Sequence, residues 1–311
     1  MENVLTVENV SKNYGNFTAL NNVSISVPKG SVFGLLGPNG AGKTSLIRII
    51  NQITLPDSGT IYLGGEKLQP QHVHQIGYLP EERGLYKSMK VGEQALYLAQ
   101  LKGLSKSEAK KKLQLWFEKF DISNWWDKKI QELSKGMAQK VQFIVTVLHS
   151  PKLLIFDEPF SGFDPINANL IKDEILKLRD EGASIIFSTH RMESVEELCD
   201  NIALINKSNK ILDGKLIDIK KQYRTNQFEV GLLSNKNTKE VLLNQVKEHF
   251  NVETAATKSF YNDLRLIVSL KNSETSTDLI NFLNDKAQIN HFTEIIPSTN
   301  DIFIKAVGDN E

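Results

Sequence analysis

The stretch GPNGAGKT at residues 37–44 decides the fold, because it joins a predicted strand to a predicted helix. It fits the pattern G-x-x-x-x-G-K-[ST], with the apolar residues 31–36 before it and the apolar-periodic residues 44–51 after it. Its three glycines let the backbone curl so that N–H groups face phosphate oxygens, and the helix that follows directs its positive end at the same charge. We expect Lys43 to neutralise nucleotide phosphates and the Thr44 hydroxyl to hold Mg²⁺. A purely structural glycine turn is the alternative, which the flanking strand and helix disfavour.

An acidic motif follows an apolar segment later in the chain. Residues 153–156 are apolar and are followed directly by Asp157 and Glu158. In open α/β sheets the ends of such strands form the edge where ligands bind. Asp157 suits a Mg²⁺ ion, and Glu158 suits a general base that polarises the attacking water. An Asp-Glu-Pro turn that merely ends a strand is the alternative, but a phosphate loop needs such a carboxylate to hold the metal.

The pattern around these motifs is that of an α/β domain. Apolar segments at residues 153–156 and 184–188 are separated by helical spacing over residues 166–181, which is typical of parallel strands joined by crossover helices. Helical patterns dominate from about residue 90 to 150 and predict a helical subdomain. We therefore predict an α/β, P-loop ATP-binding domain with a mixed-sheet core over residues 1–222.

A polar stretch at residues 220–226 separates this pattern from a smaller C-terminal unit. We predict a small α+β domain over residues 226–308 with the element order β-α-β-β-α-β, the order of a ferredoxin-like fold. Its segments are, in that order, residues 228–233, 238–250, 252–260, 264–270, 276–287 and 289–296. A last helix is predicted over residues 298–307, with Ser298 as its N-cap. The fold of this unit does not by itself indicate a function.

The composition disfavours several other classes of protein. The 311 residues are 40% hydrophobic and carry 37 basic and 37 acidic side chains, so the net charge of zero does not favour nucleic acid as a partner. Cys199 is the only cysteine and cannot form an internal disulfide, and the first residues lack the layout of a signal peptide. The sequence contains no run of about 18 apolar residues, the length of a membrane-spanning helix. We therefore expect a cytoplasmic protein whose membrane role depends on a partner.

Further motifs resemble those of the ATP-binding subunits of ABC transporters. LSKGM at residues 133–137 resembles the LSGGQ signature, and SGFD at residues 161–164 resembles the D-loop that follows the acidic pair. His190 matches the switch histidine, and Tyr14 matches the aromatic residue that stacks on adenine. These motifs occur in the order found in the family, and the resemblance covers roughly residues 1–220.

The resemblance implies an ABC-type fold and an ATPase site with defined residue roles. Glu158 and His190 are implied as catalytic residues, and Asp164 as a D-loop residue of the dimer. The implied ligands of the metal are Thr44, Glu81 and Asp157. The residues implied to bind the nucleotide are Tyr14, Gly37, Pro38, Asn39, Gly40, Ala41, Gly42, Lys43, Thr44, Ser45, Ser134 and Gly136, of which the last two serve the opposite subunit.

The same resemblance implies cofactors, partners and a location. ATP and Mg²⁺ are the implied cofactors. A single set of motifs implies a second ATP-binding subunit, in the simplest case a second copy of this chain, which completes each site. The other implied partner is an integral-membrane permease, and nucleic acid is not implied. The protein would then lie on the inner face of the cell membrane, held there by its permease.

Three positions depart from the commonest pattern of the family. Glu81, within YLPEERG, takes the place of a glutamine that senses Mg²⁺ and contacts the permease, and a carboxylate there only accepts hydrogen bonds. In the signature, Lys135 replaces a glycine and Met137 replaces a glutamine. Lys135 either adds positive charge near the γ-phosphate or crowds a loop that glycine permits.

Together with the C-terminal unit, GYLPEERGLY and LSKGM resemble the sodium-efflux (NatA-like) branch of bacterial export ATPases. This implies export, of Na⁺ or a small drug-like cargo, through a separate permease that residues 81–82 and 84–89 would face. An ABC ATPase that acts on DNA or the ribosome is disfavoured, because the chain has neither a second motif set, coiled-coil heptads nor a cysteine cluster. A regulatory module with weak hydrolysis is the other alternative, motivated by Lys135, Met137 and Glu81.

Overall fold

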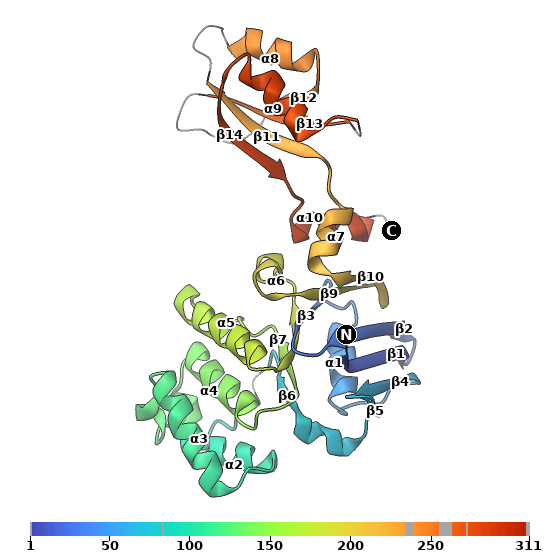
Figure 1. Ribbon diagram of the computed structural model, residues 1–311. Coiled ribbons are helices and arrows are strands. Elements are labelled where there is room, and N and C mark those ends of the chain that lie inside the picture. Colours follow the sequence, from blue (N-terminus) through green and yellow to red (C-terminus); the bar gives the residue numbers. More distant parts are fainter. Residues whose placement is uncertain (1, 83, 234–238, 255–262, 272, 309–311) are drawn as a thin grey trace. The chain divides into compact units, whose positions relative to one another are not determined.

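The computed structural model describes residues 2–82, 84–233, 239–254, 263–271 and 273–308. The chain divides into two compact units. The first unit contains the residues up to Ile217 together with those from Phe303 onward, and the second runs from Asp218 to Ile302. Figure 1 shows both units with their elements labelled.

The centre of the first unit is a six-stranded sheet. Its strands are β3 (Val32–Leu36), β6 (Ile76–Leu79), β7 (Leu153–Asp157), β8 (Ser184–Thr189), β9 (Asn201–Asn206) and β10 (Asn209–Lys215). They follow the order β10-β9-β3-β8-β7-β6, in which only the edge strand β10 runs antiparallel to its neighbour. Every residue of β3, β7 and β8 is buried, as expected of parallel strands covered on both faces. The predicted mixed-sheet core with crossover helices is confirmed.

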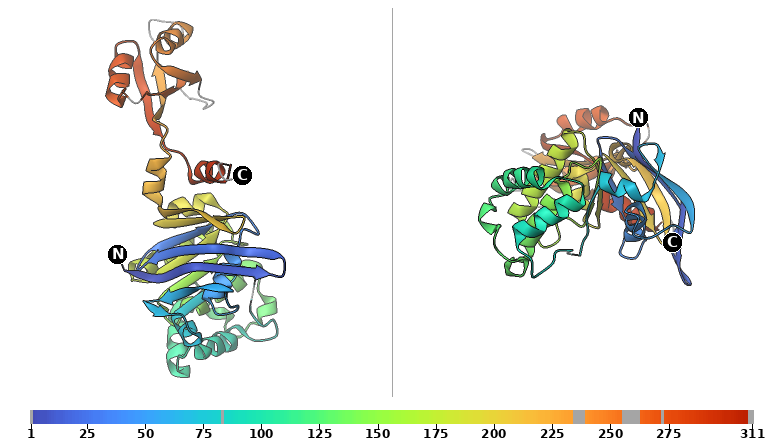
Figure 2. Two further views of the ribbon diagram at one scale, coloured as in Figure 1. Left: turned by 90° about the vertical axis from the view of Figure 1, so that its right-hand side faces the viewer. Right: turned by 90° about the horizontal axis from the view of Figure 1, so that it is seen from below.

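A second, antiparallel sheet packs in the same unit. Its strands are β1 (Asn3–Tyr14), β2 (Phe17–Pro28), β4 (Ser58–Leu63) and β5 (Glu66–Lys67), in the order β2-β1-β4-β5. Asp57, just before β4, binds the polar end of β1. Its carboxylate lies 2.7 Å from Lys12 Nζ and accepts a hydrogen bond from the Asn13 N–H. Apolar side chains from both sheets share one core with the first helix. In Figure 2 this sheet forms one side of the unit.

In the described residues the α-helices are α1 (Lys43–Ile50), α2 (Val91–Leu101), α3 (Lys106–Lys119), α4 (Lys135–Val147), α5 (Pro165–Asp180), α6 (Met192–Leu198), α7 (Leu216–Gln222), α8 (Lys239–Lys247), α9 (Ser276–Asn284) and α10 (Thr299–Gly308). Short 3₁₀ turns occupy Pro70–Gln75, Ser123–Trp125 and Ile130–Glu132. Helices α2, α3 and α4 cluster on the side of the unit away from the antiparallel sheet (Figure 2). None of the helices in the described ranges is long and apolar enough to span a bilayer.

Aromatic contacts join these helices to the central sheet. The rings of Phe120 and Phe143 lie 5.9 Å apart, and Phe143 of α4 stacks on Phe156 of β7 at 5.5 Å. All three side chains are fully buried. Because Phe156 directly precedes Asp157, the helical subdomain packs against the strand that carries the acidic pair.

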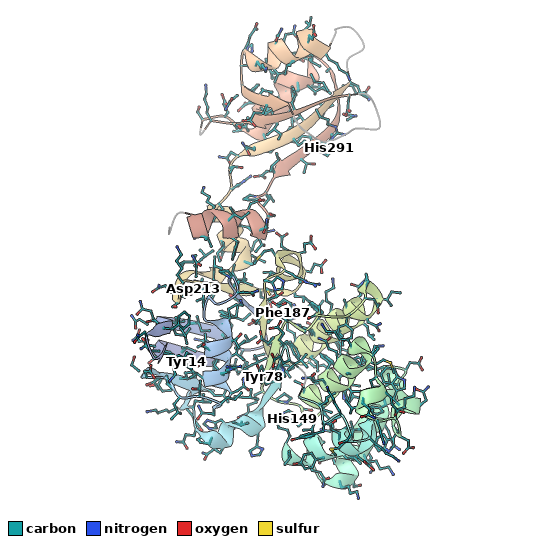
Figure 3. The ribbon with its side chains drawn as sticks, turned by 180° about the vertical axis from the view of Figure 1, so that it is seen from behind. Tyr14, Tyr78, His149, Phe187, Asp213 and His291 are labelled. Atoms are coloured by element: carbon teal, nitrogen blue, oxygen red, sulfur yellow. The ribbon has the colours of Figure 1, made fainter. Side chains whose placement is uncertain are left out.

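The second unit contains an antiparallel sheet that packs against two helices, α8 and α9. Its strands β11 (Gln227–Leu233), β12 (Asn251–Thr254), β13 (Leu264–Ser269) and β14 (Gln288–Ile295) follow the order β12-β13-β11-β14. Alternate residues of β11 and β13 pack with α8 and α9 in a separate core. The predicted β-α-β-β-α-β order is confirmed, while residue 238 and residues 255–260 of the predicted segments lie outside the described residues. Figure 3 labels His291, on β14 of this unit.

Lys102, at the C-terminal end of α2, ties the helical subdomain to the start of β6 and to the 3₁₀ turn before it. Its Nζ donates to the carbonyl oxygens of Val73 and Ile76, both at 2.9 Å. Replacing it (Lys102→Met) removes a charged donor from two carbonyls, and we expect the free energy of unfolding to fall by about 1–3 kcal/mol in urea titrations. The control Lys111→Met changes an exposed lysine of α3. Equal stability of the two variants would contradict this assignment.

Candidate functional site

The phosphate loop lies between β3 and α1, as its pattern predicts. Gly42, the N-cap of α1, has a φ of 119°, in the region that favours glycine. A Cβ atom at Gly42 would lie 2.3 Å from the carbonyl oxygen of Ala19 on β2. The loop therefore follows the neighbouring backbone so closely that a side chain does not fit at this position.

Lys43 is buried at the start of α1. Its Nζ donates to the carbonyl oxygens of Gly37 and Pro38, at 2.8 and 3.1 Å. Burial lowers the pKa of Lys43, and the negative charges of Glu158, Asp157 and Glu81 oppose that shift. These carboxylates thus help to keep the ammonium group charged and available for an anion.

Asp157 ends β7 and is 4% exposed. Burial raises its pKa, as do the negative charges of Glu81 and Glu158, while the Ser188 side chain and the Lys43 charge lower it. The charged form of Asp157 is therefore less favourable in the protein than in water, and a cation bound nearby would relieve that cost.

Glu158 is held in a defined position by the end of β8. Its backbone has a φ of 49°, in the left-handed region that is strained for residues other than glycine and is often found at functional sites. One carboxylate oxygen accepts from the backbone N–H of His190 at 2.9 Å and lies 2.6 Å from the Nδ1 atom of the same residue. The Thr189 hydroxyl donates to the other oxygen at 3.2 Å. The two predicted catalytic residues, Glu158 and His190, are thus in direct contact.

The predicted residues converge on one cavity of about 200 Å³. Its lining residues are Phe17, Ala19, Asn39, Gly40, Gly42, Lys43, Thr44, Ser45, Glu81, Asp157, Glu158 and His190. A second cavity of about 610 Å³ shares Thr44, Glu81 and Asp157 with the first and also contains Tyr14 and Tyr78. Figure 3 labels Tyr14 on the antiparallel sheet and Tyr78 on β6.

Thr44, Glu81 and Asp157, the three metal ligands implied by the resemblance, line both cavities. A hydroxyl and two carboxylates are hard oxygen donors of the kind that Mg²⁺ prefers. Within the described parts of the chain, no group of three or more His, Cys, Asp or Glu side chains is arranged to hold a metal by itself. The residues therefore fit an ion that takes further oxygen ligands from phosphate and water, the usual situation for Mg²⁺.

Several predicted residues lie outside these two cavities. The described lining residues do not include Ser134, Gly136 or Asp164. Ser134 caps α4 by accepting from the Met137 N–H, and Asp164 caps α5 in the same way from Asn167. Hydrogen bonds from Asn167 lower the pKa of Asp164 and hold that cap ionised. Gly37 and Pro38 act through their carbonyl oxygens, and Ala41 is buried beneath the loop.

Phe17 and Arg48 are among the residues of these cavities that sequence reasoning missed. Phe17 is 57% exposed and lines the smaller cavity, while Tyr14, its partner across the β1–β2 turn, lines the larger one. Arg48 of α1 lines the larger cavity and supplies a cation there, whereas Lys43 lines the smaller one. Phe17 could have been found from its distance of three residues from Tyr14 across a tight turn, whereas Arg48 carries no motif.

Comparisons with known proteins extend over both units. Residues 20–161 match the ABC transporter family, and residues 214–307 match the family described as "ATP-binding protein DrrA1-3-like, C-terminal domain". The uncharacterized ABC transporter ATP-binding protein YhaQ of Bacillus subtilis (strain 168) is 41% identical over 305 residues, which cover 98% of this chain and 99% of YhaQ. The ABC transporter ATP-binding protein NatA of the same strain is 34% identical over 220 residues, 70% of this chain and 89% of NatA.

Solved structures give the same picture for the first unit. The structure described as "Structure of ATP binding subunit of ABC transporter" superposes with a TM-score of 0.66 at 32% identity. The superposition covers 71% of this chain and 93% of that one.

The close approach at Gly42 leads to a testable prediction about nucleotide affinity. We expect Gly42→Ala to weaken binding of a fluorescent ATP analogue by about tenfold or more, because the added methyl group must displace a backbone carbonyl. Gly40→Ala is the matched control, since Gly40 also has a positive φ, of 80°, but a Cβ there meets nothing within 4 Å. Thermal melting confirms that both variants are folded. Equal affinities of the two folded variants would overturn the steric argument.

Proposed function

Because this chain belongs to the family of ATP-binding subunits of ABC transporters, which hydrolyse ATP to power transport, we propose that the cavity beside Lys43 is its ATP site. The observation that supports this most strongly is that Lys43, the adjacent pair Asp157 and Glu158, and His190 come from three distant parts of the sequence and line one cavity. The relatives named for linearmycin resistance, lantibiotic transport and Nod factor export support export as the direction of transport.

In the proposed mechanism, the chain's own residues bind the triphosphate and activate water. The Lys43 ammonium exchanges its loop carbonyls for β- and γ-phosphate oxygens. Glu158 accepts a proton from the attacking water, and its contacts with Thr189 and His190 fix the direction in which the carboxylate points. Because His190 Nδ1 faces Glu158, the Nε2 atom is left to meet the γ-phosphate, and it donates there only when the ring carries both protons.

The proposal includes Mg²⁺ held by Thr44, Glu81 and Asp157. The ion would supply positive charge that neutralises the phosphates as the bond to the γ-phosphate breaks. Asp157 favours this role because burial raises its pKa, so that a cation stabilises its charged form. Glu81 replaces an amide by a carboxylate and adds negative charge for the same ion.

We propose that a second ATP-binding subunit, a second copy of this chain, completes the site. Ser134 caps α4 and Gly136 lies in its first turn, at the helix end that favours an anion, but neither residue is in the described lining of the cavities in its own chain. In a head-to-tail dimer they would contact the γ-phosphate bound by the other subunit, with Asp164 at the interface. Hydrolysis would then separate the two subunits and move the permease.

The membrane permease of the family is proposed to dock in a groove of about 350 Å³ next to Glu81. The groove lies between β6 and the helices α2 and α4, and its lining is mostly apolar, including Ile53, Leu85, Leu98, Leu101 and Val145. Burial, with the nearby Lys102 charge, lowers the pKa of the lining residue His149 to about 4, which keeps that imidazole neutral. This surface would hold the protein on the inner face of the membrane, and the second unit, Asp218–Ile302, would form an accessory domain.

Steady-state ATPase activity of the purified protein tests the proposal. We expect Glu158→Gln to lower kcat by about 100-fold or more, because the general base is lost. Lys43→Ala should weaken ATP binding by about tenfold or more, since a charged donor to phosphate is removed. Size-exclusion chromatography with ATP should show Glu158→Gln as a trapped dimer and Lys43→Ala as a monomer.

Glu181→Gln is the matched control, because Glu181 is an exposed carboxylate at the end of α5. Unchanged turnover in Glu158→Gln would remove that residue as the base. A wild-type protein that binds ATP without turnover, alone and with its permease, would favour the regulatory alternative.

A further inference from the structure

The lysine that replaces a glycine in the signature motif contacts the loop after the acidic pair. Lys135 is the first residue of α4, and its aliphatic carbons cover Gly162 within the D-loop. A Cβ atom at Gly162 would lie 2.5 Å from both Cδ and Cε of Lys135, and Gly162 has a φ of 87°. Gly136 lies beside the same loop, since its Cβ would be 3.5 Å from the Phe163 ring. The signature and the D-loop of one chain are therefore packed together.

A second contact one helical turn later points in the same direction. Gln139 is 7% exposed, and its Nε2 donates to the carbonyl oxygen of Pro159 at 2.8 Å. Residues four apart share one face of a helix, so Lys135 and Gln139 both face residues 159–162. Pro159 directly follows Glu158, and the Ser161 N–H donates to the Glu158 carbonyl at 3.0 Å. The path from the start of α4 to the proposed base is thus short and continuous.

Helix stability does not explain a lysine at this position. A cation in the first turn of a helix opposes the positive end of the helix dipole, and residues 135–137 of α4 contain no acidic side chain to offset it. The long side chain of lysine instead offers methylene groups that cover the apolar surface beneath its charged end. In this protein the covered surface is the backbone at Gly162, where any residue other than glycine would place a side chain of its own.

We propose that Lys135 is a positioning residue, whose aliphatic stem rather than its charge holds residues 159–164 against α4 and thereby keeps Glu158 aligned for hydrolysis. The inference rests on the proposed function in one respect, namely that Glu158 acts on water. The contact itself is a property of the chain without nucleotide. The sequence left two roles open for Lys135, a contact with phosphate and crowding of the loop. The proposal assigns neither role, because the stem is packed and the loop accommodates it.

Two substitutions at Lys135 separate the stem from the charge. Lys135→Met keeps most of the stem and removes the charge, whereas Lys135→Gly removes both. A matched control exists in α3, where Ser105 caps the helix from the Glu108 N–H and Lys106 is the first residue, as Ser134 and Lys135 are in α4. Lys106→Gly therefore reports the general cost of glycine at the first position of a helix.

Hydrogen exchange of the nucleotide-free protein is the first readout. We expect faster deuterium uptake at residues 159–164 in Lys135→Gly than in wild type, and wild-type uptake in Lys135→Met and Lys106→Gly. In ATPase assays, Lys135→Gly should lower kcat by about fivefold, the size of effect common for residues that couple through packing. Its KM for ATP should change by less than about twofold, because the loss falls on the chemical step.

The outcomes decide between the stem and the charge. Wild-type uptake in Lys135→Gly, or a kcat of Lys135→Met as low as that of Lys135→Gly, would overturn the proposal. Equal losses in Met and Gly variants with a raised KM would instead indicate that the ammonium group contacts phosphate. Exchange is measured without ATP, so an inactive wild-type protein would contradict the proposed function while the packing of Lys135 is still decided.

Discussion

One electrostatic constraint governs the molecule: a buried ammonium group and two buried carboxylates meet at the edge of a parallel sheet. Lys43, Asp157 and Glu158 are each exposed by less than a tenth, so none of their charges is well solvated. The parallel register of β3, β8 and β7 places the ends of the strands side by side and brings the three groups together. Burial pulls the pKa of Lys43 down and that of Asp157 up, and each group partly restores the charge of the other. An additional anion near Lys43 and an additional cation near Asp157 would therefore each stabilise the charged form of the group that it meets.

Sequence alone predicts the parts of this arrangement that are local. The phosphate loop follows from eight consecutive residues, and the positions of Asp157 and Glu158 follow from an apolar strand that ends just before them. The β-α-β-β-α-β order of the second unit also follows from periodicity along the chain. In each case the pattern and the structure depend on the same neighbouring residues, so one implies the other.

Contacts between distant segments could not be predicted in this way. The covering of Gly162 by Lys135 and the hydrogen bond from Gln139 to Pro159 depend on how α4 packs against the loop after β7. Nothing in the signature motif distinguishes a lysine whose stem is packed from one whose charge meets phosphate. The same holds for Arg48, which enters the larger cavity only because α1 lies beside it. Packing and not periodicity decides these roles.

Helix α4 connects the proposed hydrolysis site with the groove proposed for the permease. Lys135 and Gln139, in its N-terminal half, contact the loop after Glu158, while Val145 and Thr146, near its C-terminal end, line the apolar groove. Phe143, between them, stacks on β7 and is fully buried, so the helix cannot shift at one end without disturbing this packing. A helix of 13 residues is only about 20 Å long, so both contact regions belong to one short element. A partner bound in the groove and a nucleotide bound at the sheet edge would therefore act on the same helix. A displacement of α4 caused by one of them would change the contacts available to the other.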